Sequence, residues 1–271
     1  MTGPESTPDV TDVTSNAMTS DVIYVFWTGG WDSTYRIIEL SRSPVTVQPI
    51  YVAGDGRKSE TLELEAMGTI LASLEKKEGT RATFLPLKII KRSEIPPNEE
   101  ISKVFRFVQE SGFPLGSQYE WLAWLATSYP GVEVMISLRD ESCPLQLIER
   151  FGELTLQKGE WRLDPEKTTR ELFLLFGNFS FPTAAITGLE MKKNILEWGY
   201  EDVMKHIWFC HKPFHGEPCG VCHPCQIKMI QKMGFLLPKS AIRRYRRLRL
   251  AKALFGSYGE RAYQKLIRKF S

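Results

Sequence analysis

The sequence has no long hydrophobic run, and nowhere does it approach the roughly twenty consecutive apolar residues that cross a membrane. The first twenty residues have neither an apolar core nor a basic leader, so they predict neither a signal peptide nor a membrane anchor. They are rich in Ser, Thr, Pro and Asp, and we expect 1–20 to form a disordered tail. These features predict a cytoplasmic protein with no membrane partner.

The chain also has little excess of charge, because its 271 residues carry a net charge of only +3. Nothing in the whole composition therefore requires nucleic-acid binding. Hydrophobic residues make up 42% and charged residues 25%, which suits one large α/β domain with an appendage. The exception is the segment 239–271, which is basic and has helical spacing. Three interpretations stay open for it: a helix packed on a partner, a patch for nucleic acid or an acidic partner, or a solvated helix face.

Two common nucleotide-binding signatures are missing, namely Gly-Lys-Ser/Thr after a glycine-rich loop and Gly-x-Gly-x-x-Gly. What the chain does contain is an alternation of apolar strand patterns and helical patterns, which predicts a parallel sheet sandwiched by helices. The expected strands cover 22–27, 45–52, 83–89 and 132–137, and the expected helices cover 35–40, 61–74, 119–128, 169–176, a stretch from 189 and 240–270. A hairpin or a short helix is expected at 154–163. We divide the chain into 1–20, an α/β domain at 21–200, a cysteine segment at 201–238 and the basic tail at 239–271.

A short glycine loop, Thr28-Gly29-Gly30, separates the first expected strand from the first helix. Free backbone N–H groups and the positive end of the helix would face a ligand there, which predicts an anion site. Hydroxyls of Thr28, Ser33 and Thr34 would donate to phosphate oxygens. Asp32 would bind Mg²⁺ or cap the helix. The competing interpretation is a Gly-Gly turn before a capped helix.

Cysteine is scarce, yet four of the five cysteines lie together as Cys210-x8-Cys219-x2-Cys222-x2-Cys225. This spacing predicts a closed, structural zinc site with four thiolate ligands. An iron–sulfur cluster is the main alternative. The neighbouring histidines His211, His215 and His223 are alternative ligands, although four thiolates suffice. The fifth cysteine, Cys143, is expected to be a small buried residue.

The loop at 28–34 resembles the Ser-Gly-Gly-x-Asp-Ser loop of the PP-loop ATP pyrophosphatases, with Thr28 in place of the first Ser. Together with the cysteine spacing, it resembles the 7-cyano-7-deazaguanine synthase (QueC-type) family over about 22–235. Further similar segments are Gly56-Arg57-Lys58-Ser59-Glu60, Phe181-Pro182, 188–195, Trp208-Phe209-Cys210, 219–225 and Gly234-Phe235.

The middle of the chain departs from the family pattern. Residues 116–121 stand where the family has an Arg-Asn pair, and 137–143 stand where it has Asp-Tyr-x-x-x-Pro-Asp-Cys-Arg. We expect the guanine-like edge of the substrate to be bound in this region, by Gln118, Glu120, Asp140 and Glu141.

The resemblance implies a Rossmann-like HUP/PP-loop fold, a homodimer, and the cofactors ATP, Mg²⁺ and Zn²⁺. It also implies adenylylation of a 7-deazaguanine carboxylate followed by attack of an amine, with formation of AMP and/or ADP. The implied roles are phosphate binding by Gly29, Gly30, Ser33 and Thr34; Mg²⁺ placement by Asp32; charge neutralisation by Arg57 and by Lys193 or its neighbour Lys192; and adenine contacts through the backbone of Tyr51 and Val52.

Three alternative functions stay open. The same activation could join a deazapurine, or another carboxylate, to an amine on a protein or nucleotide, for example in a defence or modification system. The chain could also be a PP-loop enzyme that modifies tRNA. A non-enzymatic adaptor with a vestigial fold is the third.

Overall fold

The computed structural model describes residues 22–54, 56, 58–136, 143–157 and 159–269. Its centre is a parallel sheet with the strand order β3-β2-β1-β5-β8, in which β4 also pairs with β2. The strands are β1 (Ile23–Phe26), β2 (Thr46–Ala53), β3 (Thr83–Phe84), β4 (Lys88–Lys91), β5 (Val132–Glu133) and β8 (Phe179–Ser180). The order reverses between β1 and β5, and such a switch point opens a crevice at the carboxyl ends of the strands.

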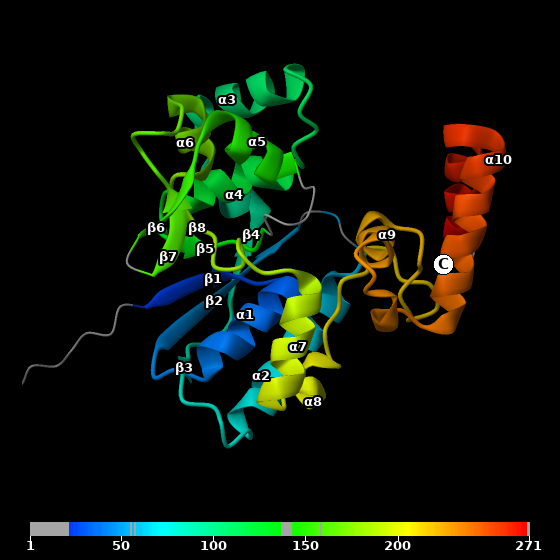
Figure 1. Ribbon diagram of the computed structural model, residues 1–271, viewed down its shortest axis with the longest axis horizontal. Coiled ribbons are helices and arrows are strands. Elements are labelled where there is room, and N and C mark those ends of the chain that lie inside the picture. Colours follow the sequence, from blue (N-terminus) through cyan, green and yellow to red (C-terminus); the bar gives the residue numbers. More distant parts are fainter. Residues whose placement is uncertain (1–21, 55, 57, 137–142, 158, 270–271) are drawn as a thin grey trace, which may run out of the picture.

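Helices cover both faces of this sheet (Figure 1). The helices on one face are α1 (Trp31–Ser41), α2 (Glu60–Glu75), α7 (Gly188–Trp198) and α8 (Glu201–Met204). Those on the other face are α3 (Glu99–Glu110), α4 (Gln118–Ala126), α5 (Cys143–Phe151) and α6 (Arg170–Phe176), and an antiparallel hairpin of β6 (Leu154–Gln157) and β7 (Glu160–Leu163) lies beside them. The predicted α/β fold with a parallel sheet between helices is thus confirmed.

Alternation along the strands explains why two cores form. In β2, Ile50 and Val52 face the α4 and α6 side of the sheet, whereas Tyr51 and Ala53 face the α1 and α2 side. Successive side chains of a strand point to opposite faces, so a continuous apolar strand needs cover on both. On the second face, α2 contributes Met67, which is fully buried.

The C-terminal region lies to one side of the sheet and contains α9 (His223–Ile230) followed by a short 3-10 turn at Gly234–Leu236. Another 3-10 turn, Arg92–Glu94, follows β4. It ends in α10 (Lys239–Lys269), which is interrupted at Gly256, where φ is 59°. After this turn the helix runs back along itself: Lys252 pairs with Glu260 at 2.8 Å, and a Cβ on Gly259 would meet the carbonyl oxygen of Ala251. The helix is therefore a hairpin, where the sequence predicted a single helix.

Several sequence expectations need correction. The strand expected at 83–89 is two short strands, because the chain leaves the sheet around Pro86 and returns as β4. Of the strand expected at 132–137, the strand itself covers only Val132–Glu133, with one further hydrogen bond of 3.0 Å from the Val134 N–H to the Ser180 carbonyl. Residues 137–142 lie outside the described residues. The α/β layers extend past residue 200, since Val203 and Met204 are buried in the same core as α1 and α2. The tail expected at 1–20 also lies outside the described residues.

Neither α3 nor β8 was expected from the sequence, whereas the hairpin at 154–163 was one of two expectations there. Among the described residues, no helix combines the length and the apolar character that a membrane span requires.

Candidate functional site

The glycine loop joins the end of β1 to the start of α1, at the switch point of the sheet. Gly29 has φ +69°, and a Cβ there would lie 3.2 Å from Met67 Cγ and 3.3 Å from the Glu63 carbonyl oxygen of α2. Both the backbone conformation and the packing therefore require glycine at this position.

Gly30 is different, because nothing in the protein itself demands a glycine. Its φ of −77° and ψ of 174° suit any residue. A Cβ would make only ordinary contacts, 3.5 Å to Thr28 Oγ1 and 3.9 Å to the Trp208 carbonyl oxygen. Gly30 is also the N-cap of α1, and no side chain caps this helix. An uncapped helix start that lacks a side chain beside it offers room and N–H donors to an anion.

The three predicted hydroxyl donors occupy different environments. Thr28 is exposed at the loop, and Ser33 is 8% exposed in the first turn of α1. Thr34 is fully buried, and its Oγ1 accepts a hydrogen bond of 3.0 Å from the indole of Trp27. The side chain of Thr34 therefore fixes α1 to β1 and does not reach the surface of the loop, contrary to the role predicted for it.

Asp32 forms an ion pair that the sequence analysis missed. Lys228 Nζ lies 3.2 Å from Asp32 Oδ2, and the Lys228 side chain is only 8% exposed, against 39% for Asp32. Lys228 also lies 3.5 Å from Gln231 Oε1. It belongs to α9, three residues after Cys225. A lysine within the apolar stretch Ile227–Ile230 was the signal available in the sequence, since a buried ammonium needs a partner.

The segment before the first cysteine also holds the loop. The Trp208 N–H donates to the Gly29 carbonyl at 2.8 Å. Trp31 stacks edge-on with Phe235 at 5.7 Å between ring centroids, and Met233 is fully buried in the core beside α1. The cysteine segment is thus attached to the glycine loop on several sides.

Strand β2 borders the loop, but its two predicted adenine contacts differ. The Trp27 N–H donates to the Ile50 carbonyl at 2.9 Å, so Ile50 and, two residues on, Val52 direct their backbone groups toward the β1 side. Tyr51 directs its backbone toward β4, with which it is in register at Ile89. Its buried hydroxyl donates to Glu63 Oε2 at 2.9 Å. Only Val52 presents its backbone beside the loop.

The predicted cationic residues are also separated. Lys193 is exposed and lines a shallow hollow with Tyr35 and Glu39, one and two turns into α1 from the loop. Lys192 Nζ lies 3.9 Å from the centre of the Phe235 ring, which itself packs on Trp31 at the start of α1. The structure therefore favours Lys192, the alternative of the pair. Arg57 lies outside the described residues.

The predicted substrate residues are placed only in part. Gln118 is exposed and Glu120 is half-buried, both in the first turn of α4. Because α4 leads directly into β5, its first turn lies toward the carboxyl edge of the sheet. Asp140 and Glu141 lie outside the described residues.

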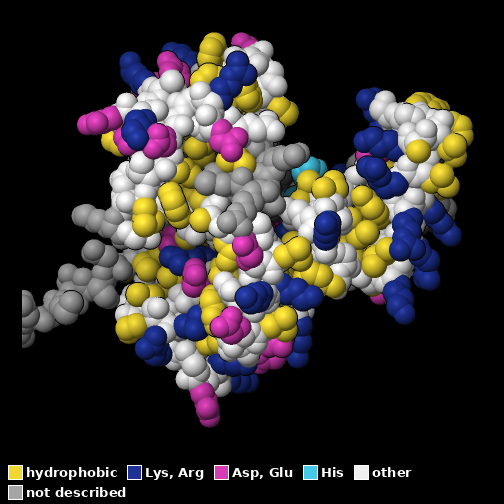
Figure 2. Space-filling view, viewed as in Figure 1, with side chains coloured by type: hydrophobic (Ala, Val, Ile, Leu, Met, Phe, Trp, Pro, Cys, Tyr) yellow, Lys and Arg dark blue, Asp and Glu magenta, His cyan; other side chains and the backbone are white. Residues whose placement is uncertain are grey.

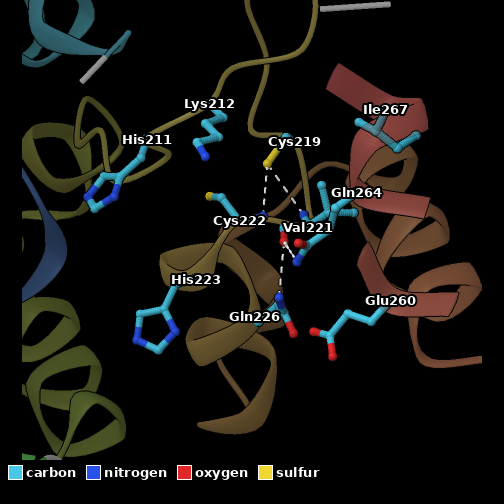
Figure 3. A pocket seen from close by; sticks show the side chains of 10 residues that line it. All are labelled: His211, Lys212, Cys219, Val221, Cys222, His223, Gln226, Glu260, Gln264 and Ile267. Carbon is cyan, nitrogen blue, oxygen red and sulfur yellow. Dashed lines mark hydrogen bonds between the residues drawn. The ribbon is translucent and has the colours of Figure 1, made fainter. Parts of the chain in front are cut away.

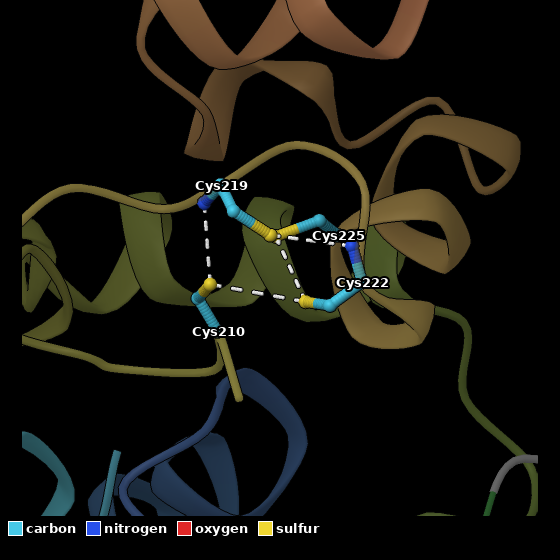
Figure 4. A group of neighbouring side chains, drawn as sticks. All are labelled: Cys210, Cys219, Cys222 and Cys225. Carbon is cyan, nitrogen blue, oxygen red and sulfur yellow. Dashed lines mark hydrogen bonds between the residues drawn. The ribbon is translucent and has the colours of Figure 1, made fainter. Parts of the chain in front are cut away.

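The four cysteines expected to bind metal come together (Figure 4). Cys210, Cys219, Cys222 and Cys225 are all buried, and their sulfur atoms lie within 4.8 Å of one another. Cys210 Sγ is 3.8 Å from Cys222 Sγ, and Cys222 Sγ is 3.5 Å from Cys225 Sγ. Four buried sulfurs at this separation can hold a metal ion such as zinc. None of the neighbouring histidines belongs to this group in the described part of the chain.

The backbone of the segment 210–225 wraps around the four sulfurs, and this segment is called the knuckle below. Cys219 Sγ accepts from the N–H groups of Val221 at 3.4 Å and Cys222 at 3.2 Å, and Cys210 Sγ accepts from Cys219 N–H at 3.2 Å. The hydrogen bond with Cys210 is the largest cause that lowers the pKa of the Cys219 thiol. Hydrogen bonds with the other three sulfurs, that of Cys210 above all, raise the pKa of the Cys225 thiol. Donated N–H groups favour thiolates, which are the form that binds metal.

The knuckle packs tightly against α10. Gly220 has φ +78°, and a Cβ there would collide with the backbone of Ala241. Beside the knuckle, a hollow of about 390 Å³ is lined by His211, His223 and Gln226 on one side and by Glu260 and Gln264 of the returning half of α10 on the other (Figure 3). Gln226 of α9 and Gln264 of α10 both donate to the Val221 carbonyl, at 3.0 and 3.2 Å. These two hydrogen bonds connect the returning half of α10 with the cysteine segment.

No protein-family model matches the chain, and no curated protein matches it in sequence.

Proposed function

We propose that this protein is a divergent member of the 7-cyano-7-deazaguanine synthase family. In this proposal it uses ATP to adenylylate the carboxylate of a 7-deazaguanine, and an amine then displaces AMP. The observation that carries the proposal is Gly30 at the uncapped start of α1, because neither its backbone conformation nor its packing explains a glycine. Close approach of a phosphate explains it.

The residues of the loop support a division of roles. The first N–H groups of α1, with Thr28 and Ser33, hold the phosphates that leave as pyrophosphate. Asp32, which is 39% exposed, places Mg²⁺. Lys228 and Lys192 neutralise the charge that develops on the α-phosphate and the leaving group. The backbone of Val52 contacts the adenine.

The cysteine cluster has a supporting role in this proposal. Zinc held by Cys210, Cys219, Cys222 and Cys225 has no open position for water, so it would stabilise the local fold without activating a reactant. The folded knuckle then keeps Trp208 on Gly29 and Lys228 on Asp32.

The reaction itself is the test. The full chain is incubated with 7-carboxy-7-deazaguanine, MgATP and ammonia, with pyrophosphate and AMP measured enzymatically and the deazapurine followed by mass spectrometry. We expect pyrophosphate release that depends on the deazapurine, together with an amide or nitrile product. Gly30→Ala should lower the rate at least about tenfold, since a methyl group would displace the phosphate.

Gly68 provides the matched control for that variant. It is an exposed glycine of α2 with nothing within 4 Å of a built Cβ, so Gly68→Ala should leave the rate unchanged. If the unchanged protein released no more pyrophosphate than Asp32→Ala, this result would contradict the proposal and favour a non-enzymatic adaptor.

A second candidate uses the same activation but a different amine, carried by a protein or nucleotide. The exposed basic surface of α10 favours it, because a small-molecule enzyme has no need of one. Pyrophosphate release that stalls at the acyl-adenylate when ammonia is supplied would support this candidate over the synthase.

A further inference from the structure

The most basic part of the chain is α10, and the glycine loop makes no use of it. Residues 239–269 hold eleven Lys and Arg residues and one acidic residue, Glu260. The net charge of the whole chain is only +3, so the remainder of the chain is acidic.

The segment 243–249 contains five arginines, and only one of them packs on the knuckle. Arg244 turns inward, where Nε donates to the Cys219 carbonyl at 2.7 Å and Nη2 to the Pro218 carbonyl at 3.0 Å. The other four arginines are exposed, and the part of the chain that the structure describes gives none of them an acidic partner within 4 Å; they are Arg243, Arg246, Arg247 and Arg249.

Apolar side chains continue the same surface toward the turn of the hairpin. Leu250 is 59% exposed and Leu254 is 65% exposed, and Phe255 and Tyr258 are exposed by 66% and 80%. Figure 2 shows Lys and Arg side chains gathered over α10, with hydrophobic side chains at its upper end. Arg243, Arg247, Leu250 and Leu254 follow helical spacing, so they form one outer stripe that is basic at its base and apolar toward the tip.

The composition of this outer stripe discriminates between occupants. A second copy would bring two basic stripes together, and like charges would oppose that contact. A nucleic acid would satisfy the arginines, but aliphatic Leu250 and Leu254 have no role against phosphates.

A lipid surface is disfavoured by geometry. Insertion of the tip would carry the non-helical backbone at Gly256 into hydrocarbon, where its polar groups have no partners. A helix lying flat needs its charges on the face opposite its apolar residues, whereas here both share one stripe.

We propose that the outer stripe of α10 docks an acidic amphipathic helix from a separate protein. Arg243 to Leu254 spans about 16 Å of helix, so the partner contributes about three turns. Its Asp and Glu side chains lie against Arg243 and Arg247, and its Leu, Ile or Phe side chains lie against Leu250 and Leu254. The proposal does not depend on the reaction at the glycine loop.

A designed peptide tests this with the full chain. The probe is a fluorescent helical peptide with leucines in its first turns and glutamates in its last turns, all on one face. Its affinity is measured by fluorescence anisotropy at low and high salt. We expect Arg243→Glu/Arg247→Glu and Leu250→Ser/Leu254→Ser each to weaken binding by about tenfold or more, with circular dichroism showing unchanged helix content.

Matched controls come from α3, on the far side of the sheet. Lys103→Glu/Arg106→Glu reverses two exposed charges, and Phe107→Ser removes a side chain that is 60% exposed. Both should bind the peptide as the unchanged protein does. A peptide of the same composition with its leucines and glutamates spread around the helix should bind at least about tenfold more weakly.

Several outcomes would overturn the proposal. These are absence of binding at millimolar peptide, equal binding of the spread peptide, and affinity that neither double variant changes. Tighter binding of single-stranded RNA or of vesicles rich in phosphatidylserine would assign the stripe to those partners instead. Self-association that Arg243→Glu/Arg247→Glu abolishes in sedimentation velocity would assign it to a second copy.

Discussion

At the scale of single residues, Lys228 changes how the candidate site is understood. A buried ammonium is costly unless it is paired, and its closest anionic partner here is the half-exposed carboxylate of Asp32 at 3.2 Å. Asp32 stands at a helix start, where its charge is already favoured. Lys228 is therefore placed where the phosphates of a nucleotide would add further anionic partners. This position favours a role in nucleotide binding over a role in stabilising the fold.

Substitutions of Lys228 separate these two roles. Lys228→Met keeps the apolar stem and removes the charge, so we expect the free energy of unfolding to change by less than about 1 kcal/mol. Affinity for a non-hydrolysable ATP analogue should fall about tenfold or more, while Lys228→Arg should retain most of it. Urea unfolding and isothermal titration calorimetry measure the two quantities. Lys205→Met, at an exposed lysine after α8, is the control, and unchanged affinity in Lys228→Met would refute the role.

At the scale of elements, local patterns predicted those strands and helices whose burial repeats along the sequence. Helix α2 is an example, since its buried residues Met67, Ile70 and Leu74 recur at helical spacing. Strand β1 shows no such repeat and was predicted from its continuous apolar run instead. Helix α3 was missed although Asn98 caps it through a hydrogen bond of 3.1 Å to Ile101 N–H. The preceding Pro96-Pro97 signalled a loop, and the helix begins only two residues later. Strand β8 is too short to show a period, and the sheet defines it through pairing with β5.

The same limit applies to the site. The glycine loop and the cysteine group are contiguous motifs, so sequence spacing predicted them. The contacts of Asp32 with Lys228 and of Gly29 with Trp208 join residues far apart in the chain, and no spacing rule reaches that far.

Another long-range contact holds α1 on β5. Arg36 donates to Glu133 through Nε at 2.9 Å and Nη2 at 2.6 Å, and Glu133 is only 1% exposed. Burial raises the pKa of Glu133, and the hydrogen bonds from Arg36 oppose that rise. In Arg36→Met the opposition is lost, so the folded-state pKa of Glu133 should rise further above its unfolded value.

A carboxyl whose pKa is higher in the folded than in the unfolded state contributes its full stability below the unfolded pKa. That contribution is lost as pH rises through the folded pKa. Arg36→Met should therefore cost about 3–5 kcal/mol at pH 7.5 and distinctly less at pH 5, each relative to the unchanged protein. Urea unfolding at the two pH values measures this. Arg36→Met/Glu133→Gln has no buried carboxyl at this contact, so its cost should not vary with pH, and a pH-dependent cost there would contradict the assignment to Glu133.

At the scale of the whole molecule, the cysteine knuckle connects the α/β layers with α10. Trp208, Lys228 and Met233 reach from it to the glycine loop and its core, while Ala241 and Arg244 of α10 pack on its other side. Loss of metal should therefore disturb both the glycine loop and the packing of α10. The buried sulfurs would lose their common partner, and the small hydrophobic cluster around them cannot hold the fold alone.

Removal of the metal tests that connection. We expect about one zinc per chain and no visible absorbance, whereas an iron–sulfur cluster would give a coloured protein. Stripping the metal with a chelator, or Cys222→Ser, should reduce helix content, increase proteolysis between 201 and 269, and weaken binding of an ATP analogue, because Lys228 and Trp208 would no longer be held on the loop. Cys143→Ser leaves the four cluster cysteines intact and should change none of these readouts. If metal loss altered the region 201–269 but left nucleotide affinity unchanged, the knuckle would stabilise only its own region. The conformation of the glycine loop would then depend on Gly29 and the packing of α2 alone.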